Sequence, residues 1–165
     1  TAKASHVLAT AFNHDGSLLA ATSANGYVHV YDNIIQKDVA AILCTAAHGM
    51  ASRCCKFSPD GRLLYTASDD QHVSVIDTRA NGFSAVKSFA CGSMALSLDV
   101  SPDGRHFAVG GADGNVTLWD LGMQRREAVY NSHTDQVWCV AYDRTNAEGK
   151  RFATVGDDSM LQIYE

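Results

Sequence analysis

Two sets of side chains in this sequence combine a hydroxyl, an imidazole and a carboxylate, which are the groups of a hydrolase triad. The sets are His48, Thr66 and Asp70, and His133, Thr154 and Asp158. In a triad, the hydroxyl attacks the substrate, the imidazole takes its proton and the carboxylate orients the ring. Because the set occurs twice, and because nucleophilic catalysis also needs an open pocket with an oxyanion hole, we interpret both sets as buried structural contacts. The sequence therefore predicts no catalytic residue and a protein that is not an enzyme.

The remaining chemical motifs also favour structural roles. The glycine-rich run at 110–114 is followed by neither the lysine nor the helix of a phosphate-binding loop. The acidic pairs Asp69-Asp70 and Asp157-Asp158 fall in predicted tight turns, where one carboxylate is structural and its neighbour is solvated. Seven histidines are scattered, and the five cysteines contain no C-x-x-C pair, which is typical of free thiols in a reducing compartment. We therefore predict no metal site and no cofactor, and we assign turn and surface roles to the histidines.

Composition argues against two kinds of partner. The 165 residues carry 13 Lys and Arg against 18 Asp and Glu, so no basic face is available to neutralise the phosphates of a nucleic acid. No apolar run approaches the roughly 18 residues that a membrane span needs. The opening residues 1–10 also lack the pattern of a signal peptide. The sequence thus predicts a protein that binds neither nucleic acid nor membranes directly.

One sequence repeat occurs four times along the chain. An apolar residue followed by a turn opens each unit, and in two units that turn is Ser-Pro-Asp-Gly. These openings are at Phe12, Phe57, Val100 and Tyr142. A second landmark closes each unit, at Tyr31-Asp32, Ile76-Asp77, Trp119-Asp120 and Tyr164-Glu165. Both landmarks recur every 42 to 45 residues, so they mark repeats of one structural unit.

Each unit has the pattern of four short strands, which is typical of a propeller blade. In the first unit the expected strands are 7–12, 18–22, 27–31 and 39–43. We predict a single all-β domain over residues 1–165, a partial propeller with repeats at about 1–47, 48–90, 91–132 and 133–165. The fourth repeat stops on its third strand. We therefore expect the C-terminal part of a longer propeller, or a ring completed by a second copy of the chain.

The Trp119-Asp120 dipeptide together with the Ser-Pro-Asp-Gly turns resembles the WD-repeat β-propeller family over the whole chain. The resemblance implies a tetrad of His, Ser or Thr, Asp and Trp that locks each blade. The candidate members are His48, Thr66 and Asp70, then Asp113 and Trp119, then His133, Thr154, Asp158 and Tyr164. The locks are partial. Ile76 and Tyr164 stand at the Trp position, Cys91 and Val109 replace the His and the hydroxyl of the third repeat, and the first repeat has little of the set.

A closer similarity links the chain to the WD-repeat subunit of superkiller (Ski) complexes. It is carried by the segments 63–70, 135–138, 155–158 and 163–164, and it is weaker over residues 1–38. The resemblance implies a seven-bladed, non-catalytic adaptor that holds a helical-repeat scaffold and a helicase together for RNA decay by the exosome. It also implies an intracellular location, in the cytoplasm with the nucleus as an alternative. The alternative assemblies are a transcription-elongation complex, the meiotic recombination machinery and a ubiquitin-ligase receptor.

The loops that surround one mouth of the channel are the expected partner-binding surface of such a propeller. The candidate residues there are Ser52, Arg53, Met94, Asp135, Gln136 and Trp138. Trp138 is the proposed anchor, because a large amphipathic ring suits the centre of a protein interface. The alternative for Trp138 is a position in the core between blades. A propeller that binds a small molecule in its channel is a third hypothesis.

Overall fold

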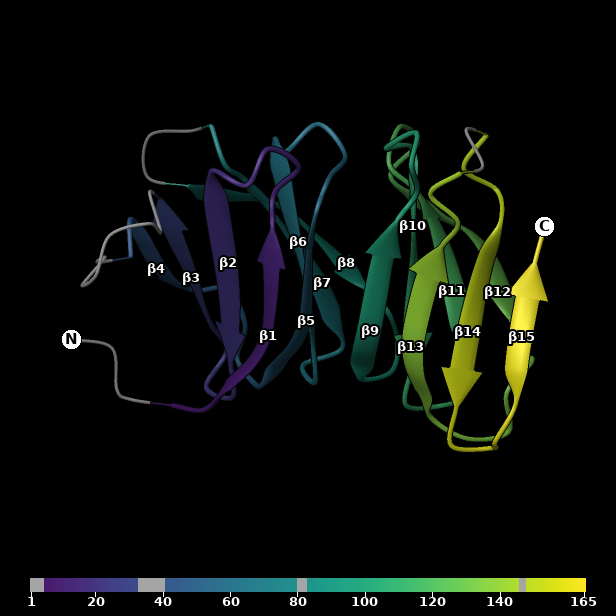
Figure 1. Ribbon diagram of the computed structural model, residues 1–165. Helices are drawn as coiled ribbons and strands as arrows, with labels where there is room; N and C mark the ends of the chain where they lie inside the picture. Colours follow the sequence, from purple (N-terminus) through teal and green to yellow (C-terminus); the bar gives the residue numbers. More distant parts are fainter. Residues whose placement is uncertain (1–4, 33–40, 80–82, 146–147) are drawn as a thin grey trace.

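The computed structural model describes residues 5–32, 41–79, 83–145 and 148–165, which form four antiparallel sheets (Figure 1). In each sheet the strands lie in sequence order, so every sheet is a meander of neighbouring hairpins. Blade 1 contains β1 (Val7–Phe12), β2 (Leu18–Ser23), β3 (Tyr27–Asp32) and β4 (Leu43–Ala46). Blade 2 contains β5 (Ser52–Phe57), β6 (Leu63–Ser68), β7 (His72–Asp77) and β8 (Ser84–Ala90).

Blades 3 and 4 follow in the same direction along the chain. Blade 3 contains β9 (Ala95–Val100), β10 (His106–Gly111), β11 (Val116–Asp120) and β12 (Arg125–Tyr130). Blade 4 contains three strands, β13 (Val137–Tyr142), β14 (Phe152–Gly156) and β15 (Leu161–Tyr164). The all-β propeller with four blades that the repeats predicted is therefore confirmed. No helix in the described part of the chain is long and apolar enough to cross a membrane.

The outer strand of blade 1 lies later in the sequence than predicted. The expected strand was 39–43, of which residues 39 and 40 lie outside the described part of the chain. The observed strand β4 begins at Leu43 and pairs with β3 in the register Val30 to Leu43 and Tyr27 to Ala46. The prediction followed an apolar run, but the position of this strand is decided by its pairing with β3.

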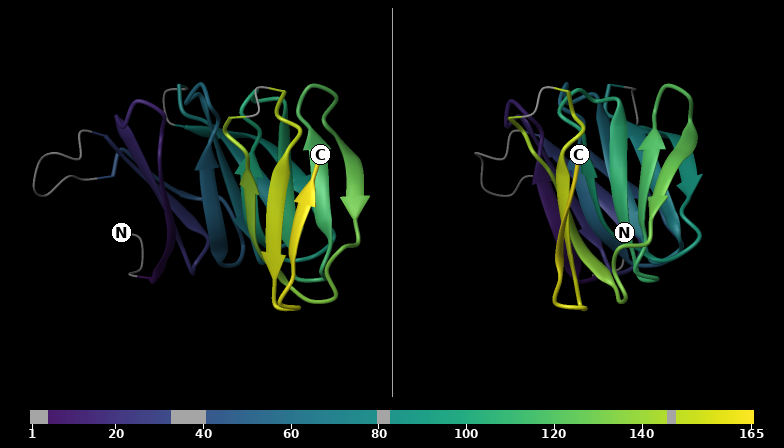
Figure 2. Two further views of the ribbon diagram at one scale, coloured as in Figure 1. Left: turned by 45° about the vertical axis from the view of Figure 1, so that its right-hand side comes forward. Right: turned by 90° about the vertical axis from the view of Figure 1, so that its right-hand side faces the viewer.

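The blades stack through their faces, with the innermost strands β1, β5, β9 and β13 side by side (Figures 1 and 2). Three apolar layers fill the spaces between successive blades, and side chains that alternate along the strands supply them. The layer between blades 2 and 3 contains an aromatic cluster in which Phe89 lies 5.2 Å from both Phe107 and Trp119, measured between ring centroids. Trp119 is therefore a core residue of this layer.

The two terminal blades each present one face that no other described blade covers. In Figures 1 and 2, β1–β4 lie at one end of the stack and β13–β15 lie at the other. The outward face of blade 4 carries Leu161 and Ile163, which are 60% and 64% exposed, and that of blade 1 carries Phe12. These faces have the apolar composition of a layer between blades.

Candidate partner-binding rim and the polar networks beside it

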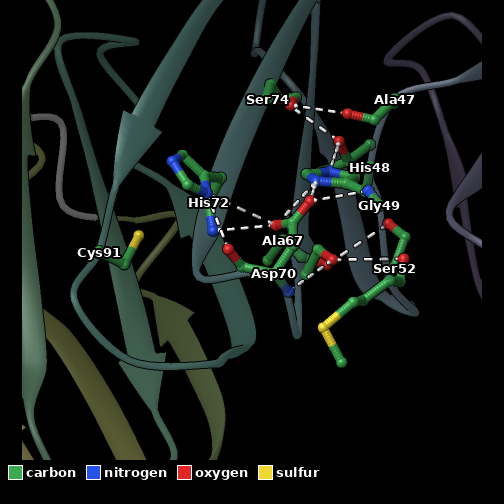
Figure 3. A network of polar contacts seen from close by, with 12 residues as sticks. Ala47, His48, Gly49, Ser52, Ala67, Asp70, His72, Ser74 and Cys91 are labelled. Carbon is green, nitrogen blue, oxygen red and sulfur yellow. Dashed lines mark hydrogen bonds and ion pairs between the residues drawn. The ribbon is translucent and has the colours of Figure 1, made fainter.

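The predicted triad of blade 2 forms one connected network that joins the segment before β5 to the second strand β6 and to the turn between β6 and β7 (Figure 3). His48 Nδ1 lies 3.0 Å from Asp70 Oδ2, and His48 Nε2 lies 2.8 Å from Thr66 Oγ1. The Asp70 carboxylate also accepts hydrogen bonds from the backbone N–H groups of Gly49 and His72, each at 3.1 Å. Since a carboxylate only accepts, Nδ1 of a neutral His48 carries the ring proton and Nε2 accepts from the Thr66 hydroxyl.

Burial decides the charge of this network. It lowers the pKa of His48 below its usual value, against the attraction and the hydrogen bond of Asp70. Burial raises the pKa of Asp70, but attraction to His48 and the hydrogen bonds from Gly49, His48 and His72 together bring that pKa below its usual value. At neutral pH the network therefore consists of a neutral imidazole and an ionised carboxylate.

Blade 4 repeats the same network with a tyrosine added. His133 Nδ1 lies 2.9 Å from Asp158 Oδ2, and Nε2 lies 2.7 Å from Thr154 Oγ1. The hydroxyl of Tyr164 lies 3.5 Å from Thr154 Oγ1 and 2.6 Å from the hydroxyl of Ser132. The hydrogen bond from His133 is the main cause that lowers the pKa of Asp158. Tyr164 thus links the outermost strand of this blade to the network.

Neither network has the access that a hydrolase nucleophile requires. Thr66 and Thr154 are 0% and 1% exposed, and the hydroxyl of each contacts the histidine of its own network. A substrate carbonyl therefore cannot reach either hydroxyl. The two networks instead join the segment that precedes each blade to its second strand and to the turn that follows it.

Among the described residues, blades 1 and 3 do not form this network. In blade 3, Asp113 accepts hydrogen bonds from Asn115, and Trp119 Nε1 donates to Thr117 Oγ1 at 3.3 Å, so the structure does not bring Asp113 and Trp119 together. Cys91 stands in place of the histidine, and burial raises the pKa of its thiol to about 12. In blade 1 a short contact from Ser23 to Asn25 remains. These departures follow the substitutions seen in the sequence.

A β-bulge recurs near the start of every innermost strand. In three of these strands the register shifts between Val7 and Ala9 (β1), between Ser52 and Cys54 (β5) and between Val137 and Cys139 (β13). In β9 it shifts between Ala95 and Ser97, which pair with Gly111 and Gly110 of β10. A bulge leaves one extra residue and re-aims its side chain. The four extra residues are Leu8, Arg53, Leu96 and Trp138.

All four bulges lie at the same end of the stack, which is the lower end in Figure 1. Two of the predicted partner-binding residues, Arg53 and Trp138, are therefore structurally equivalent. Trp138 is 48% exposed, so its ring is not part of a closed core between blades. Leu96 is buried, whereas Leu8 is exposed.

The remaining predicted residues differ in their availability. Ser52 is 0% exposed and its hydroxyl donates to the backbone oxygen of Ala67, so the prediction of a surface contact for Ser52 is wrong. It occupies an inward position of β5, one residue before the bulge. Met94 and Asp135 are exposed and Gln136 is partly buried.

Arg53 is already paired within its own blade. Its guanidinium forms hydrogen bonds with both carboxylate oxygens of Asp69, at 2.9 Å from Nε to Oδ1 and 2.7 Å from Nη2 to Oδ2. The Arg53 side chain remains 42% exposed in this pair. Arg53 can therefore contact a partner without losing its fixed orientation.

We use the name rim for Leu8, Arg53, Met94, Gln136 and Trp138. Sequence reasoning missed Leu8, although its place in the first repeat matches those of Arg53 and Trp138. The signal that could have found it is the alignment of the four repeats at the bulge. The bulges themselves have no clear sequence signature, which is why the exposed position was not recognised.

Residues 15–122 match the family described as "Cytochrome D1 heme domain", and residues 124–165 match the family "WD domain, G-beta repeat". The chain is 34% identical over 155 residues to "WD repeat-containing protein SL1-17" of Schistosoma mansoni, covering 94% of this chain and 49% of that protein. It is 32% identical over 120 residues to "WD repeat, SAM and U-box domain-containing protein 1" of Danio rerio, covering 70% of this chain and 24% of that protein.

The fold is similar to a chain in the crystal structure of the mitotic checkpoint complex, with a TM-score of 0.82 and 24% sequence identity. That match covers 94% of this chain and 46% of the other one. At this identity the likeness shows the fold alone. The chain thus spans less than half the length of each of these proteins.

The first family match implies a haem, which the described residues do not fit. Haem iron needs a His, Met, Cys or Tyr ligand inside an apolar slot. The buried histidines His48 and His133 use both ring nitrogens for hydrogen bonds. The cavity beside Tyr142 measures about 210 Å³, below the roughly 300–1,000 Å³ of drug-sized ligand sites. A larger cavity of about 400 Å³ contains His14, but it is an open hollow flanked by charged Lys56, and His14 is exposed.

In this chain the Trp-Asp and Ser-Pro-Asp-Gly landmarks lie at the turns and strand ends of the antiparallel blades. The chain therefore has the fold of a WD-repeat β-propeller, and its residues 124–165 match the WD-repeat family.

Proposed function

We propose that this protein is a protein-interaction scaffold whose rim binds a segment of a partner protein, with Trp138 as the anchor. The observation that carries the proposal is the recurring bulge, which in blades 1, 2 and 4 places a re-aimed and exposed side chain at one end of the stack. Tryptophan and arginine are the residue types that dominate binding energy at protein interfaces. The rim offers both, next to the apolar side chains of Leu8 and Met94.

The acidic composition supports a protein partner over a nucleic acid, since the chain carries more Asp and Glu than Lys and Arg. In its finer form the proposal is a WD-repeat adaptor of a Ski-type complex, which binds a helical-repeat scaffold and a helicase and assists exosome-mediated RNA decay. Its support is the similarity of segments 63–70, 135–138, 155–158 and 163–164 described above. This form places the protein in the cytoplasm, with the nucleus as the alternative. An adaptor of a transcription, recombination or ubiquitin-ligase assembly uses the same rim.

Affinity capture with the full-length protein tests both forms. Trp138→Ala is expected to reduce capture of the rim-bound partner at least tenfold, because the side chain is the largest exposed apolar surface of the rim. The matched control is Met123→Ala, which removes a side chain that is 65% exposed in the turn between β11 and β12. Circular dichroism melting of both variants checks that the fold is retained.

The outcomes separate the two forms of the proposal. Loss of a helical-repeat scaffold and a helicase in Trp138→Ala, but not in Met123→Ala, supports the Ski-type form. Selective loss of other proteins supports the scaffold and contradicts the Ski-type form. If Trp138→Ala and Met123→Ala capture the same proteins in the same amounts, the rim is not the binding surface.

A further inference from the structure

Blade 3 brings together three side chains with the donor atoms of a metal site. His106, Asp120 and Glu127 lie on the neighbouring strands β10, β11 and β12, and one ligand atom of each lies within 4.8 Å of the other two. His106 Nε2 is 3.2 Å from Glu127 Oε2 and 4.0 Å from Asp120 Oδ2. In the described residues, no other group of three such side chains is this close. His106 begins β10 and Asp120 ends β11, so their pair lies at the end of blade 3 opposite the bulge near the start of β9.

The backbone explains how these side chains meet. His106 and Asp120 are directly paired across β10 and β11. In β12 the register shifts, because Leu118 pairs with Ala128 and the next residue of β11 pairs with Arg126. Glu127 is therefore the extra residue of a β-bulge, and a bulge re-aims its side chain.

Comparison with blade 2 shows that the cluster is not a general feature of the repeat. Leu63 pairs with Asp77 there as His106 pairs with Asp120, and the same register shift makes Val86 the extra residue. The aspartate is thus common to both blades, whereas two apolar side chains are replaced in blade 3 by an imidazole and a carboxylate. Blade 2 is an internal reference for a blade without donor atoms.

Asp120 can hold a cation without losing its structural contact. Its Oδ1 accepts a hydrogen bond from the backbone N–H of Met123 at 2.7 Å, which fixes the carboxylate. Its other oxygen, Oδ2, is the one nearest to His106. One oxygen is therefore engaged with the turn and the other points to the cluster.

A cavity of about 210 Å³ adjoins the cluster, and its lining includes His106 and Glu127. Tyr142 also lines this cavity. The Tyr142 hydroxyl is buried and has no hydrogen-bond partner among the described residues. A buried hydroxyl without a partner is uncommon in proteins, and a bound water or polar ligand would satisfy it. The cavity has room for several water molecules, since one water occupies about 30 Å³ in the liquid.

We propose that His106, Asp120 and Glu127 bind a divalent transition-metal ion, zinc being the best match. Imidazole nitrogen and carboxylate oxygen are both zinc ligands, at about 2.0–2.2 Å from the metal. At those bond lengths the ligand atoms of a tetrahedral site lie about 3.3 Å apart. The pair His106 and Glu127 is already at that spacing, at 3.2 Å, and Asp120 Oδ2 lies somewhat farther out, at 4.0 Å from His106 Nε2. The adjoining cavity, which His106 and Glu127 line, has room for a water as the fourth ligand.

Isothermal titration of zinc into the full-length protein tests this site. The measurement uses a Cys139→Ser background, because this exposed thiol is free and would bind zinc itself. His106→Leu and Glu127→Val give blade 3 the side chains found at the same places in blade 2. Each is expected to weaken binding of the zinc ion at least tenfold. Glu127→Gln tests the same point with little change in size.

The matched control is His72→Leu, which removes an exposed histidine with a carboxylate oxygen of Asp70 at 3.9 Å. This variant is expected to bind one zinc ion as tightly as the background. The alternative role of the cluster is an ion pair between a protonated His106 and the two carboxylates. Equal zinc affinity in the background, His106→Leu and Glu127→Gln would overturn the metal site and leave that ion pair.

Discussion

At the residue scale, one buried histidine in blade 2 and one in blade 4 hold together the elements of their own blade. His48 and His133 are both 7% exposed, and each links a hydroxyl on the second strand to a carboxylate in the next turn. These are the atoms of a hydrolase triad in a place where no substrate can enter. The same hydrogen bonds therefore serve to fix the entry of each blade instead of activating a nucleophile.

The buried state of His48 predicts an acid-sensitive fold. Since the folded pKa lies below the unfolded value of 6.5, the unfolded chain takes up a proton at His48 before the folded chain does. Stability from this residue is complete above pH 6.5 and is lost below it, by up to about 1.4 kcal/mol per pH unit. Urea denaturation between pH 7.0 and 5.5 measures the slope.

The matching variants for this measurement are His48→Asn and His14→Asn, the second at an exposed position. The slope is expected to shrink in His48→Asn and to persist in His14→Asn. Below this range the lowered pKa of Asp70 and of Asp158 adds a further loss, because both carboxylates are protonated as the pH falls below their usual range. An unchanged slope in His48→Asn would contradict the assignment.

The residue types of these networks could be predicted from the sequence, because each set recurs with the repeat. Exposure could not be predicted in the same way. Ser52 was expected at the surface and is buried, whereas Leu8 was not considered and is exposed. Both errors have one cause, which is that a bulge exchanges inward and outward positions within a strand without a marked change of sequence.

At the scale of the elements, the turn between the second and third strands shows a conflict between sequence and backbone. The same turn occurs in all blades, and its third residue has a positive φ. That residue is Gly26, Gln71, Gly114 and Ser159 in blades 1 to 4, with φ of 80°, 69°, 80° and 63°. Two blades therefore place a side chain in the left-handed region, which costs about 1–2 kcal/mol.

Exchange of these residues gives changes of opposite sign. Ser159→Gly is expected to raise the free energy of unfolding by about 0.5–1 kcal/mol, since relief of the left-handed strain exceeds the extra entropy of glycine in the unfolded chain. Gly26→Ala is expected to lower it by at least about 2 kcal/mol. A Cβ at Gly26 would overlap the carbonyl oxygen of His48 and lie 2.7 Å from that of Met50.

Chemical denaturation of both variants measures these effects through the midpoint at constant slope. Gln71→Gly provides an independent copy of the first change and is expected to have the same sign. A gain of stability in Gly26→Ala would show that the turn does not hold its backbone in the observed conformation.

On the scale of the whole molecule, the repeat was the most predictable property. Two sequence landmarks that recur with the same period were enough to predict the number of blades and their order. The reason is that each repeat forms one blade, whose strands pair with one another. The packing between blades was not predictable residue by residue. Trp119, for example, was assigned to a polar tetrad, but its ring stacks with Phe107 at 6.1 Å between centroids.

The outward face of blade 4 predicts how the chain of residues 1–165 behaves in isolation. Val155 and Leu161 are paired across β14 and β15, as are Ala153 and Ile163, so their side chains form one apolar surface. Burial of each leucine or isoleucine is worth about 1.5–3 kcal/mol. We expect this chain to self-associate with rising concentration in light scattering, because the layer that covers such a face in the rest of the stack is a second blade.

Ile163→Lys should suppress that association, since a charge on this face cannot be buried against an apolar layer without a partner. Val129→Lys is the matched control, because Val129 lies on the outer strand β12, away from the exposed end faces, and is 42% exposed. In a longer chain or a closed ring of two copies the same substitution would instead prevent the next blade from docking. If the chain of residues 1–165 stays monomeric at all concentrations, or if the two variants associate equally, the outward face of blade 4 does not drive self-association.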